Sequence, residues 1–180
     1  MSTNIWPKEI KSIPVSRTND ILVIGDVMLD QYLSGSTDRL SPEAPVPVVK
    51  IDSQFSVLGG AANVANNLAA LGANVSLLGV VGRDDNARIV NELLEAKGIA
   101  NQLLDADIFT TVKTRVISRN QQMVRVDREE VFSDEDAFVN HLSGVLSFFQ
   151  GSAIIVSDYA KGVCSPGAMK VILTWATNFF

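Results

Sequence analysis

Residues 59–65 read Gly59-Gly60-Ala61-Ala62-Asn63-Val64-Ala65, and Gly72 and Gly82 follow further along the chain. Glycine has no Cβ, so the main chain at this pair can approach a ligand closely. A helix that begins just after the pair would point its free N–H groups outward, with Asn63 in its first turn. The amide of Asn63 both donates and accepts hydrogen bonds, which suits a polyhydroxylated ligand. We therefore expect Gly59, Gly60 and Asn63 to contact such a ligand.

The residues after the glycine pair have helical spacing. Val64, Leu68 and Leu71 recur at i, i+4 and i+7, which predicts a buried helix face over residues 61–71. Gly72 is typical of a helix C-terminus. A glycine-rich turn leading into an ordinary packing helix is the alternative interpretation of the whole stretch.

The composition is that of a globular protein with small-molecule partners. The 180 residues are 47% hydrophobic and 19% charged, and 15 basic against 20 acidic residues give a net charge of −5. This charge provides no basic surface for nucleic acid. Cys164 is the only cysteine, so it has no partner for an internal disulfide. No apolar run reaches the roughly 18 residues of a membrane span, and residues 1–16 lack the apolar region of a secretory signal. A cytoplasmic location is expected.

Apolar runs alternate with helical patterns along the chain, which predicts an α/β fold around a parallel sheet. The runs are residues 21–25, 75–81 and 153–156, and the helices are expected over residues 61–71, 84–97 and 133–150. Two segments, about 34–57 and 111–127, break this alternation because they contain prolines, alternating strands and a turn at residues 119–122. We place them in a small accessory sheet that covers a site.

Three aspartates follow apolar strands, where ligands bind in open α/β sheets. Asp30 is the first candidate because its carboxylate can accept hydrogen bonds from two hydroxyls. Asp26 is as well explained by a turn or capping role. Asp158 either binds ligand or pairs with Lys161 in its loop.

Cations in the expected hairpin suit a phosphate group. Lys113 and Arg115 share one face of their strand by alternation, and Arg119 lies in the turn. Edge strands also carry such cations to prevent pairing with other chains, and this alternative is favoured for any single one. His141 has no second His or Cys motif near it, so no metal site is predicted.

The glycine stretch resembles the first signature of the ribokinase-like sugar kinases, and five matched positions favour it over the packing-helix alternative. One subgroup is similar over much longer runs, namely VIGDVMLD (23–30), RLSPEAPVPVV (39–49), SRNQQ (118–122) and SDYAKG (157–162). This subgroup contains the kinases of D-glycero-β-D-manno-heptose 7-phosphate, which serve ADP-heptose and lipopolysaccharide synthesis. The resemblance implies a ribokinase-like parallel-sheet sandwich with a small β-sheet lid.

The resemblance also implies a chemistry and an assembly. The family phosphorylates the anomeric hydroxyl with ATP and Mg²⁺, uses the Asp30 position to bind sugar, and dimerises through the lid strands. The candidate contacts with the phosphosugar therefore also include Asp26, Lys113, Arg115, Arg119, Asp158 and Lys161.

The family's catalytic base stands in a Gly-Ala-Gly-Asp turn, and no Gly-x-Gly-Asp occurs in this sequence. We therefore expect residues 1–20 to form a leader, residues 21–180 to form the N-terminal part of the kinase domain, and the nucleotide-binding half and catalytic base to lie beyond Phe180. The dinucleotide G-x-G-x-x-G and P-loop motifs are absent as well. A kinase of another phosphosugar, or a non-catalytic sugar-binding or dimerisation module, remains the alternative function.

Overall fold

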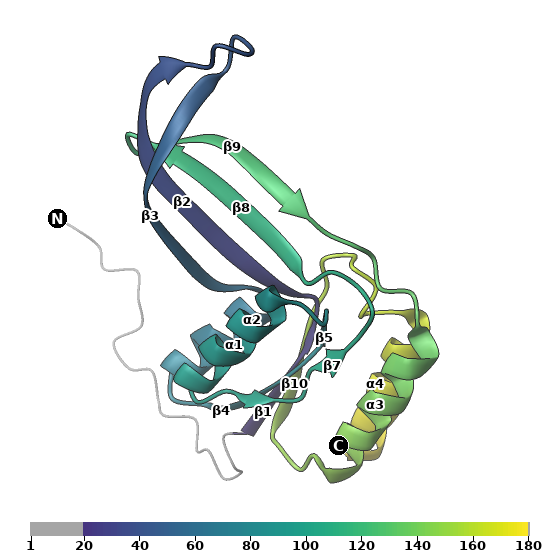
Figure 1. Ribbon diagram of the computed structural model, residues 1–180. Coiled ribbons are helices and arrows are strands. Elements are labelled where there is room, and N and C mark those ends of the chain that lie inside the picture. Colours follow the sequence, from purple (N-terminus) through teal and green to yellow (C-terminus); the bar gives the residue numbers. More distant parts are fainter. Residues whose placement is uncertain (1–19, 180) are drawn as a thin grey trace, which may run out of the picture.

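Two β-sheets divide the chain into a core and an arm that projects from it (Figure 1). The computed structural model describes residues 20–179, so the predicted leader lies outside the described residues except at Asp20. The core sheet has four parallel strands in the order β10-β1-β4-β6. Their bounds are β1 Asp20–Gly25, β4 Asn74–Leu78, β6 Ala100–Asn101 and β10 Ala153–Ser157.

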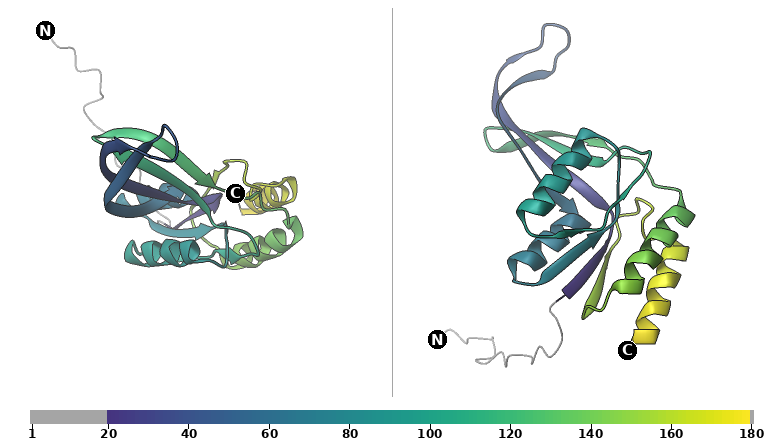
Figure 2. Two further views of the ribbon diagram at one scale, coloured as in Figure 1. Left: turned by 45° about the horizontal axis from the view of Figure 1, so that its top comes forward. Right: turned by 60° about the horizontal axis from the view of Figure 1, so that its bottom comes forward.

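Helices cover both faces of the core sheet (Figures 1 and 2). On one face lie α1 (Ala61–Ala70) and α2 (Asp85–Ala96), and on the other lie α3 (Glu135–Phe148) and α4 (Pro166–Phe179). Strand β1 explains this arrangement, because Val23 points into one hydrophobic cluster while Leu22 and Ile24 point into the other. All three residues are fully buried, as the continuous apolar run predicts. The predicted α/β fold class is confirmed.

The run predicted as one strand over residues 75–81 forms two strands. Gly79 separates β4 from β5 (Val80–Val81), which pairs with β7 (Leu104–Asp105) in a small sheet of its own. A Cβ at Gly79 would lie 2.5 Å from the carbonyl oxygen of Gly25. Only glycine fits so close to β1 at this position.

The second sheet, here called the projecting sheet, has the strand order β3-β2-β8-β9. Its bounds are β2 Val27–Leu40, β3 Pro47–Gly60, β8 Thr111–Ser118 and β9 Gln121–Arg128. The accessory sheet is thus where the sequence predicts it, but β2 and β3 are 14 residues each and reach beyond the predicted segment 34–57 at both ends. Arg119 and Asn120 form the predicted hairpin turn with φ of 50° and 64°, the conformation of a type I′ turn.

Two helix predictions need correction. The buried residues of α1 are Ala61, Ala62 and Ala65, whereas Leu71 is 84% exposed. Small side chains allow this helix to lie close to the sheet, so the alanine face is the buried one. Helix α3 begins at Glu135, two residues after the predicted start, and is capped by Asp134, which accepts from Ala137 N at 3.0 Å.

The direction of chain connection reverses beside β1. The chain returns through α1 to β4 on one side of β1, and through α3 to β10 on the other side. Ligands in open α/β sheets bind at the carboxyl ends of strands where this reversal occurs. The carboxyl ends of β1 and β10 are therefore the place to look for a site. Within residues 20–179 no helix is long and apolar enough to cross a membrane.

Candidate functional site

Asp26 organises the loop that follows β10. Its carboxylate is 1% exposed and accepts from Tyr159 N at 2.7 Å, Lys161 N at 3.1 Å and Val163 N at 3.2 Å. Its main-chain oxygen accepts from Ala61 N at 2.9 Å, which ties down the start of α1. Of the two predicted roles for Asp26, the structure supports the turn-forming one. The carboxylate has no exposed face for a ligand.

The glycine pair permits close contacts with β2. A Cβ at Gly60, where φ is +54°, would lie 2.4 Å from the main-chain oxygen of Asp26. A Cβ at Gly59 would lie 2.7 Å from Oδ2 of Asp30. Any side chain at these positions would force β3 away from the two aspartates. The glycines therefore place the start of α1 beside the end of β1.

Asp30 lies inside β2, four residues past Asp26, and not directly after a strand as the sequence suggested. Its Oδ1 receives a hydrogen bond of 2.7 Å from Arg115 in β8, and the two side chains are 21% and 22% exposed. This hydrogen bond raises the pKa of Arg115, and its effect is larger than that of burial, which lowers the pKa. The guanidinium also lies 5.3 Å from the ring centre of Tyr32, which stacks on Phe55 at 4.8 Å.

A group of charged side chains joins the projecting sheet to the loop after β10. Glu129 binds two ammonium groups, Lys161 at 2.9 Å and Lys113 at 3.3 Å. Lys113 also binds Asp127 at 3.0 Å, and Asp127 binds Arg125 at 2.9 Å. We call these five residues the ion cluster.

The contacts within the ion cluster change the pKa values of Lys113 and Glu129. Burial alone would lower the pKa of Lys113, but its hydrogen bonds to Asp127 and Glu129 outweigh burial and raise it. Hydrogen bonds from Lys161 and Lys113 lower the pKa of Glu129. The charged forms of Lys113 and Glu129 are therefore favoured.

Two sequence-based alternatives are corrected by these contacts. Lys161 pairs with Glu129, whereas the carboxylate of Asp158 accepts from Ala160 N at 2.8 Å inside its own loop. Lys113 and Arg115 lie on β8, which has neighbours on both sides, so they do not protect a sheet edge. Their shared face of the strand is confirmed by the ion pairs.

The remaining candidates lie in two places. Asn63 is exposed in the first turn of α1, whose N-terminus has no side-chain cap. Arg119 lies at the far tip of the projecting sheet and pairs with Asp38 at 3.1 Å, with both side chains more than 70% exposed. The structure thus brings Asp30, Gly59, Arg115 and Lys113 together and separates Arg119 from them.

Sequence reasoning missed Tyr32, Phe55, Asp127 and Glu129. The alternation of Arg125 and Asp127 along β9 was the available signal for one of them, since it predicts a shared face with the cations of β8. Glu129 lies 32 positions before Lys161, so no local pattern predicts their pairing. His141 contacts the main-chain oxygen of Gln102 at 2.8 Å and lies in α3, away from these residues.

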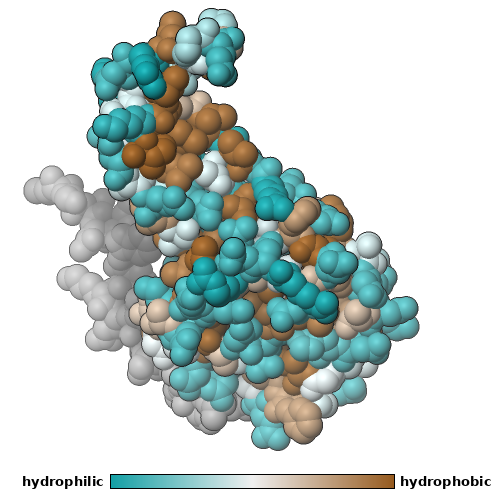
Figure 3. Space-filling view, viewed as in Figure 1, coloured by the Kyte–Doolittle hydropathy of each residue, from teal (hydrophilic) through white to brown (hydrophobic). Residues whose placement is uncertain are grey.

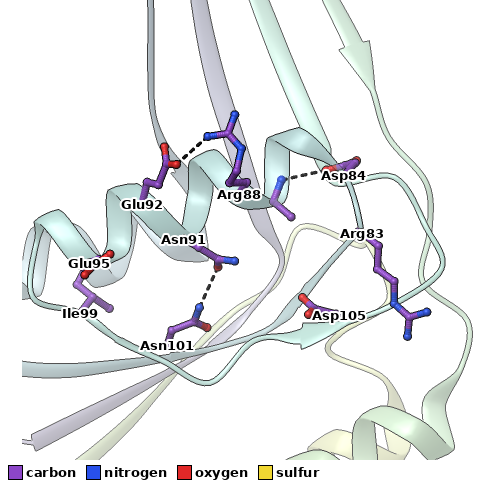
Figure 4. Close-up of a pocket in the computed structure, with 11 residues that line it drawn as sticks. Arg83, Asp84, Arg88, Asn91, Glu92, Glu95, Ile99, Asn101 and Asp105 are labelled. Carbon is purple, nitrogen blue, oxygen red and sulfur yellow. Dashed lines mark hydrogen bonds and ion pairs between the residues drawn. The ribbon is translucent and has the colours of Figure 1, made fainter.

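A separate cleft of about 620 Å³ runs along α2 (Figure 4), and none of the ten predicted site residues lines it. Asp84 lies at one end, where it caps α2 through Ala87 N at 2.9 Å and accepts from Thr110 N at 3.0 Å. Burial would raise the pKa of Asp84, but these hydrogen bonds together outweigh it and lower the pKa. Asp84 has a structural task, because it ties α2 to the start of β8.

The family described as pfkB family carbohydrate kinase matches residues 18–165. The chain belongs to this family. It is 45% identical over 152 residues to the bifunctional protein HldE of Shewanella loihica, covering 84% of this chain and 32% of that protein. It is 47% identical over 146 residues to the D-beta-D-heptose 7-phosphate kinase of Bordetella bronchiseptica, covering 79% of this chain and 46% of that kinase. The chain therefore spans less than half of either relative.

Solved structures show the same fold. Phosphofructokinase-2 from Escherichia coli in complex with substrates and products superposes with a TM-score of 0.68 at 16% identity, over 89% of this chain and 51% of that one. The resemblance to ribokinase-like sugar kinases, and the fold that it implies, are confirmed.

Proposed function

We propose that this chain is the sugar-binding part of an ATP-dependent kinase that phosphorylates D-glycero-β-D-manno-heptose 7-phosphate on the anomeric hydroxyl, in ADP-heptose and lipopolysaccharide synthesis. The observation that carries the proposal is the setting of Asp30. Its carboxylate lies in β2, the strand that follows the carboxyl end of β1, is held by Arg115 at 2.7 Å, and is closely approached by Gly59. The names of the relatives supply the choice of sugar.

The proposed contacts are divided between hydroxyls and charge. Asp30 accepts hydrogen bonds from sugar hydroxyls, and Asn63 in the uncapped first turn of α1 donates and accepts. A fixed carboxylate is useful here because its orientation is set before the sugar arrives. Asp158 and Lys161 stand at the end of β10, on the side from which ligands enter such sheets.

ATP and Mg²⁺ belong to the proposed reaction. Within residues 20–179 no group of three or more His, Cys, Asp or Glu side chains is arranged to hold a metal ion. We assign no step of phosphoryl transfer to residues of this chain. We expect the purified 180 residues to release no measurable ADP from ATP when heptose 7-phosphate is added.

The projecting sheet is the proposed lid, and we propose that it also forms a homodimer in the cytoplasm. Hydrophobic residues gather over this sheet in the space-filling view (Figure 3). Val124 and Val126, which lie on one face of the edge strand β9, are each more than half exposed. Apolar area of this kind is typical of a surface that a partner covers, and a two-fold contact is the commonest symmetric solution.

Calorimetry with the purified chain tests the sugar assignment. Heptose 7-phosphate should bind, and Asp30→Asn should weaken binding by about tenfold or more because a hydroxyl loses a charged acceptor. Asp38→Asn is the matched control, since Asp38 lies on the same strand and pairs with Arg119 in solvent. Tighter binding of fructose 6-phosphate than of heptose 7-phosphate would assign the chain to another phosphosugar. Equal effects of the two substitutions would remove Asp30 from the site.

A further inference from the structure

Glu129 holds together two lysines that come from different parts of the fold. Lys113 projects from β8 of the projecting sheet, and Lys161 projects from the loop after β10 of the core. The ammonium groups bind separate oxygens of the one carboxylate, at 3.3 Å and 2.9 Å. Two ammonium groups that converge on two oxygens of one anion have the arrangement that a phosphate group requires.

Both lysines have an attachment besides Glu129. Lys113 is held by Asp127 at 3.0 Å, and Asp127 is in turn held by Arg125. The loop of Lys161 is fixed by the buried carboxylate of Asp26, which accepts from the main-chain N–H of Lys161 at 3.1 Å. Glu129 has no such support, because it follows the end of β9 and its side chain is 37% exposed. Glu129 is therefore the member that can leave.

Charge favours its replacement by a phosphate. The ion cluster contains the cations Lys113, Arg125 and Lys161 against the anions Asp127 and Glu129, so its net charge is positive. When Glu129 leaves, the cluster loses one of its two negative charges and its net charge becomes more positive. A phosphate monoester carries about −1.5 to −2 at pH 7 and offers three acceptor oxygens, so it balances the remaining charge better than one carboxylate does.

The ion cluster lies next to the proposed sugar site. Asp30 and Lys113 are register partners in neighbouring strands, and Lys113 and Asp127 are register partners in the next pair. The three side chains therefore lie in one row on one face of the sheet. A sugar whose hydroxyls bind Asp30 places an attached phosphate within reach of Lys113.

We propose that Lys113 and Lys161 form the subsite for the phosphate group already present on the sugar, and that Glu129 occupies this subsite until the substrate displaces it. The proposal rests on the proposed function for its ligand. It assigns Arg115 to the orientation of Asp30 and excludes Arg119 from the phosphate. Binding of the substrate exchanges the bridge through Glu129 for a bridge through the substrate, so the projecting sheet and the loop after β10 stay connected.

Isothermal titration calorimetry with the whole chain tests the subsite, using heptose 7-phosphate, the same heptose without phosphate, inorganic phosphate and ATP. Lys113→Met and Lys161→Met should each weaken the binding of heptose 7-phosphate about tenfold or more, because the phosphate loses a charged donor. The affinity for the unphosphorylated heptose should change less than about twofold. Lys170→Met, an exposed lysine on α4, is the matched control and should change neither.

Glu129→Gln separates a displaced carboxylate from a purely structural ion pair. If Glu129 competes with phosphate, its neutralisation should increase the affinity for heptose 7-phosphate and for inorganic phosphate about threefold or more. Glu130→Gln makes the same charge change one residue away and should have no effect. Unchanged or weaker phosphate binding in Glu129→Gln overturns the proposal.

The remaining outcomes distinguish the two proposals. An equal loss for phosphorylated and unphosphorylated heptose in the lysine variants refutes the subsite while leaving the sugar assignment standing. A loss of ATP affinity in place of sugar affinity also refutes it, because the lysines then serve the nucleotide. Lysine-dependent binding of inorganic phosphate without binding of either heptose supports the subsite and refutes heptose as the substrate.

Discussion

Strands β1 and β8 each lie inside a sheet, yet their side chains differ in kind. Leu22, Val23 and Ile24 of β1 are fully buried between two layers of helices. Lys113 and Arg115 of β8 point to one side, where they form ion pairs at 3.0 Å and 2.7 Å. The core sheet is thus stabilised by the burial of apolar side chains, which contributes a large free energy and requires no oppositely charged partner. The projecting sheet relies more on partly exposed ion pairs and stacking, which contribute less and leave its charges available to a ligand.

Truncation of one phenylalanine in each region gives the largest difference. Phe138 in α3 is 1% exposed, and Phe138→Ala should reduce the free energy of unfolding by about 3–5 kcal/mol because it leaves a cavity in the core. Phe55 is 52% exposed, and Phe55→Ala should cost no more than about 1.5 kcal/mol, the contribution of its stacking on Tyr32. Urea denaturation followed by circular dichroism measures both. Similar costs would contradict the assignment of stability to the core.

The junction between the two regions depends on Asp26. Asp26→Ala should cost about 2–3 kcal/mol, because the N–H groups of Tyr159, Lys161 and Val163 lose a charged acceptor in a buried setting. Amide hydrogen exchange at those three residues should accelerate. Asp158→Ala is the control in the same loop and should cost under about 1 kcal/mol, because its single bond to Ala160 N is exposed. Equal costs would show that the loop is held by other contacts.

The proposed homodimer tests whether the projecting sheet is complete on its own. Val124 and Val126 lie on one face of the edge strand β9 and are 51% and 56% exposed. Light scattering should show two chains of 19.4 kDa per particle at micromolar concentration. The double variant Val124→Glu, Val126→Glu should weaken association about tenfold or more, since each glutamate would be desolvated in the contact. A monomeric wild-type chain would contradict the dimer.

The difference between the regions also explains which features the sequence predicts. Continuous apolar runs predict β1 and β10 because a strand buried on both faces has no other pattern. The start of β2 was not predicted, because residues 27–29 continue the apolar pattern after Asp26 and yet belong to the projecting sheet. Gly59 and Asp30 were predicted as site residues. Their contact with each other could not be predicted, because it depends on the register in which β2 pairs with β3. The Glu129 bridge depends on the packing of a loop against a sheet, which no spacing in the sequence encodes.

The smallest expected effect concerns pH and the attachment of α2 to the projecting sheet. The pKa of Asp84 is lowered in the folded chain, so the unfolded state binds the proton more readily. The stabilising contribution of Asp84 is therefore complete above its unfolded pKa of about 4, and it is lost as the pH falls through the lowered folded value. Asp84→Asn should be less stable than the wild type at neutral pH, and the gap should narrow below about pH 4. Asp85→Asn is the control, since the Asp85 side chain is 93% exposed and lies one residue away. Thermal unfolding of the three proteins across this range measures the gap, and a gap that is constant with pH would show that the charge of Asp84 does not stabilise the junction of α2 with β8.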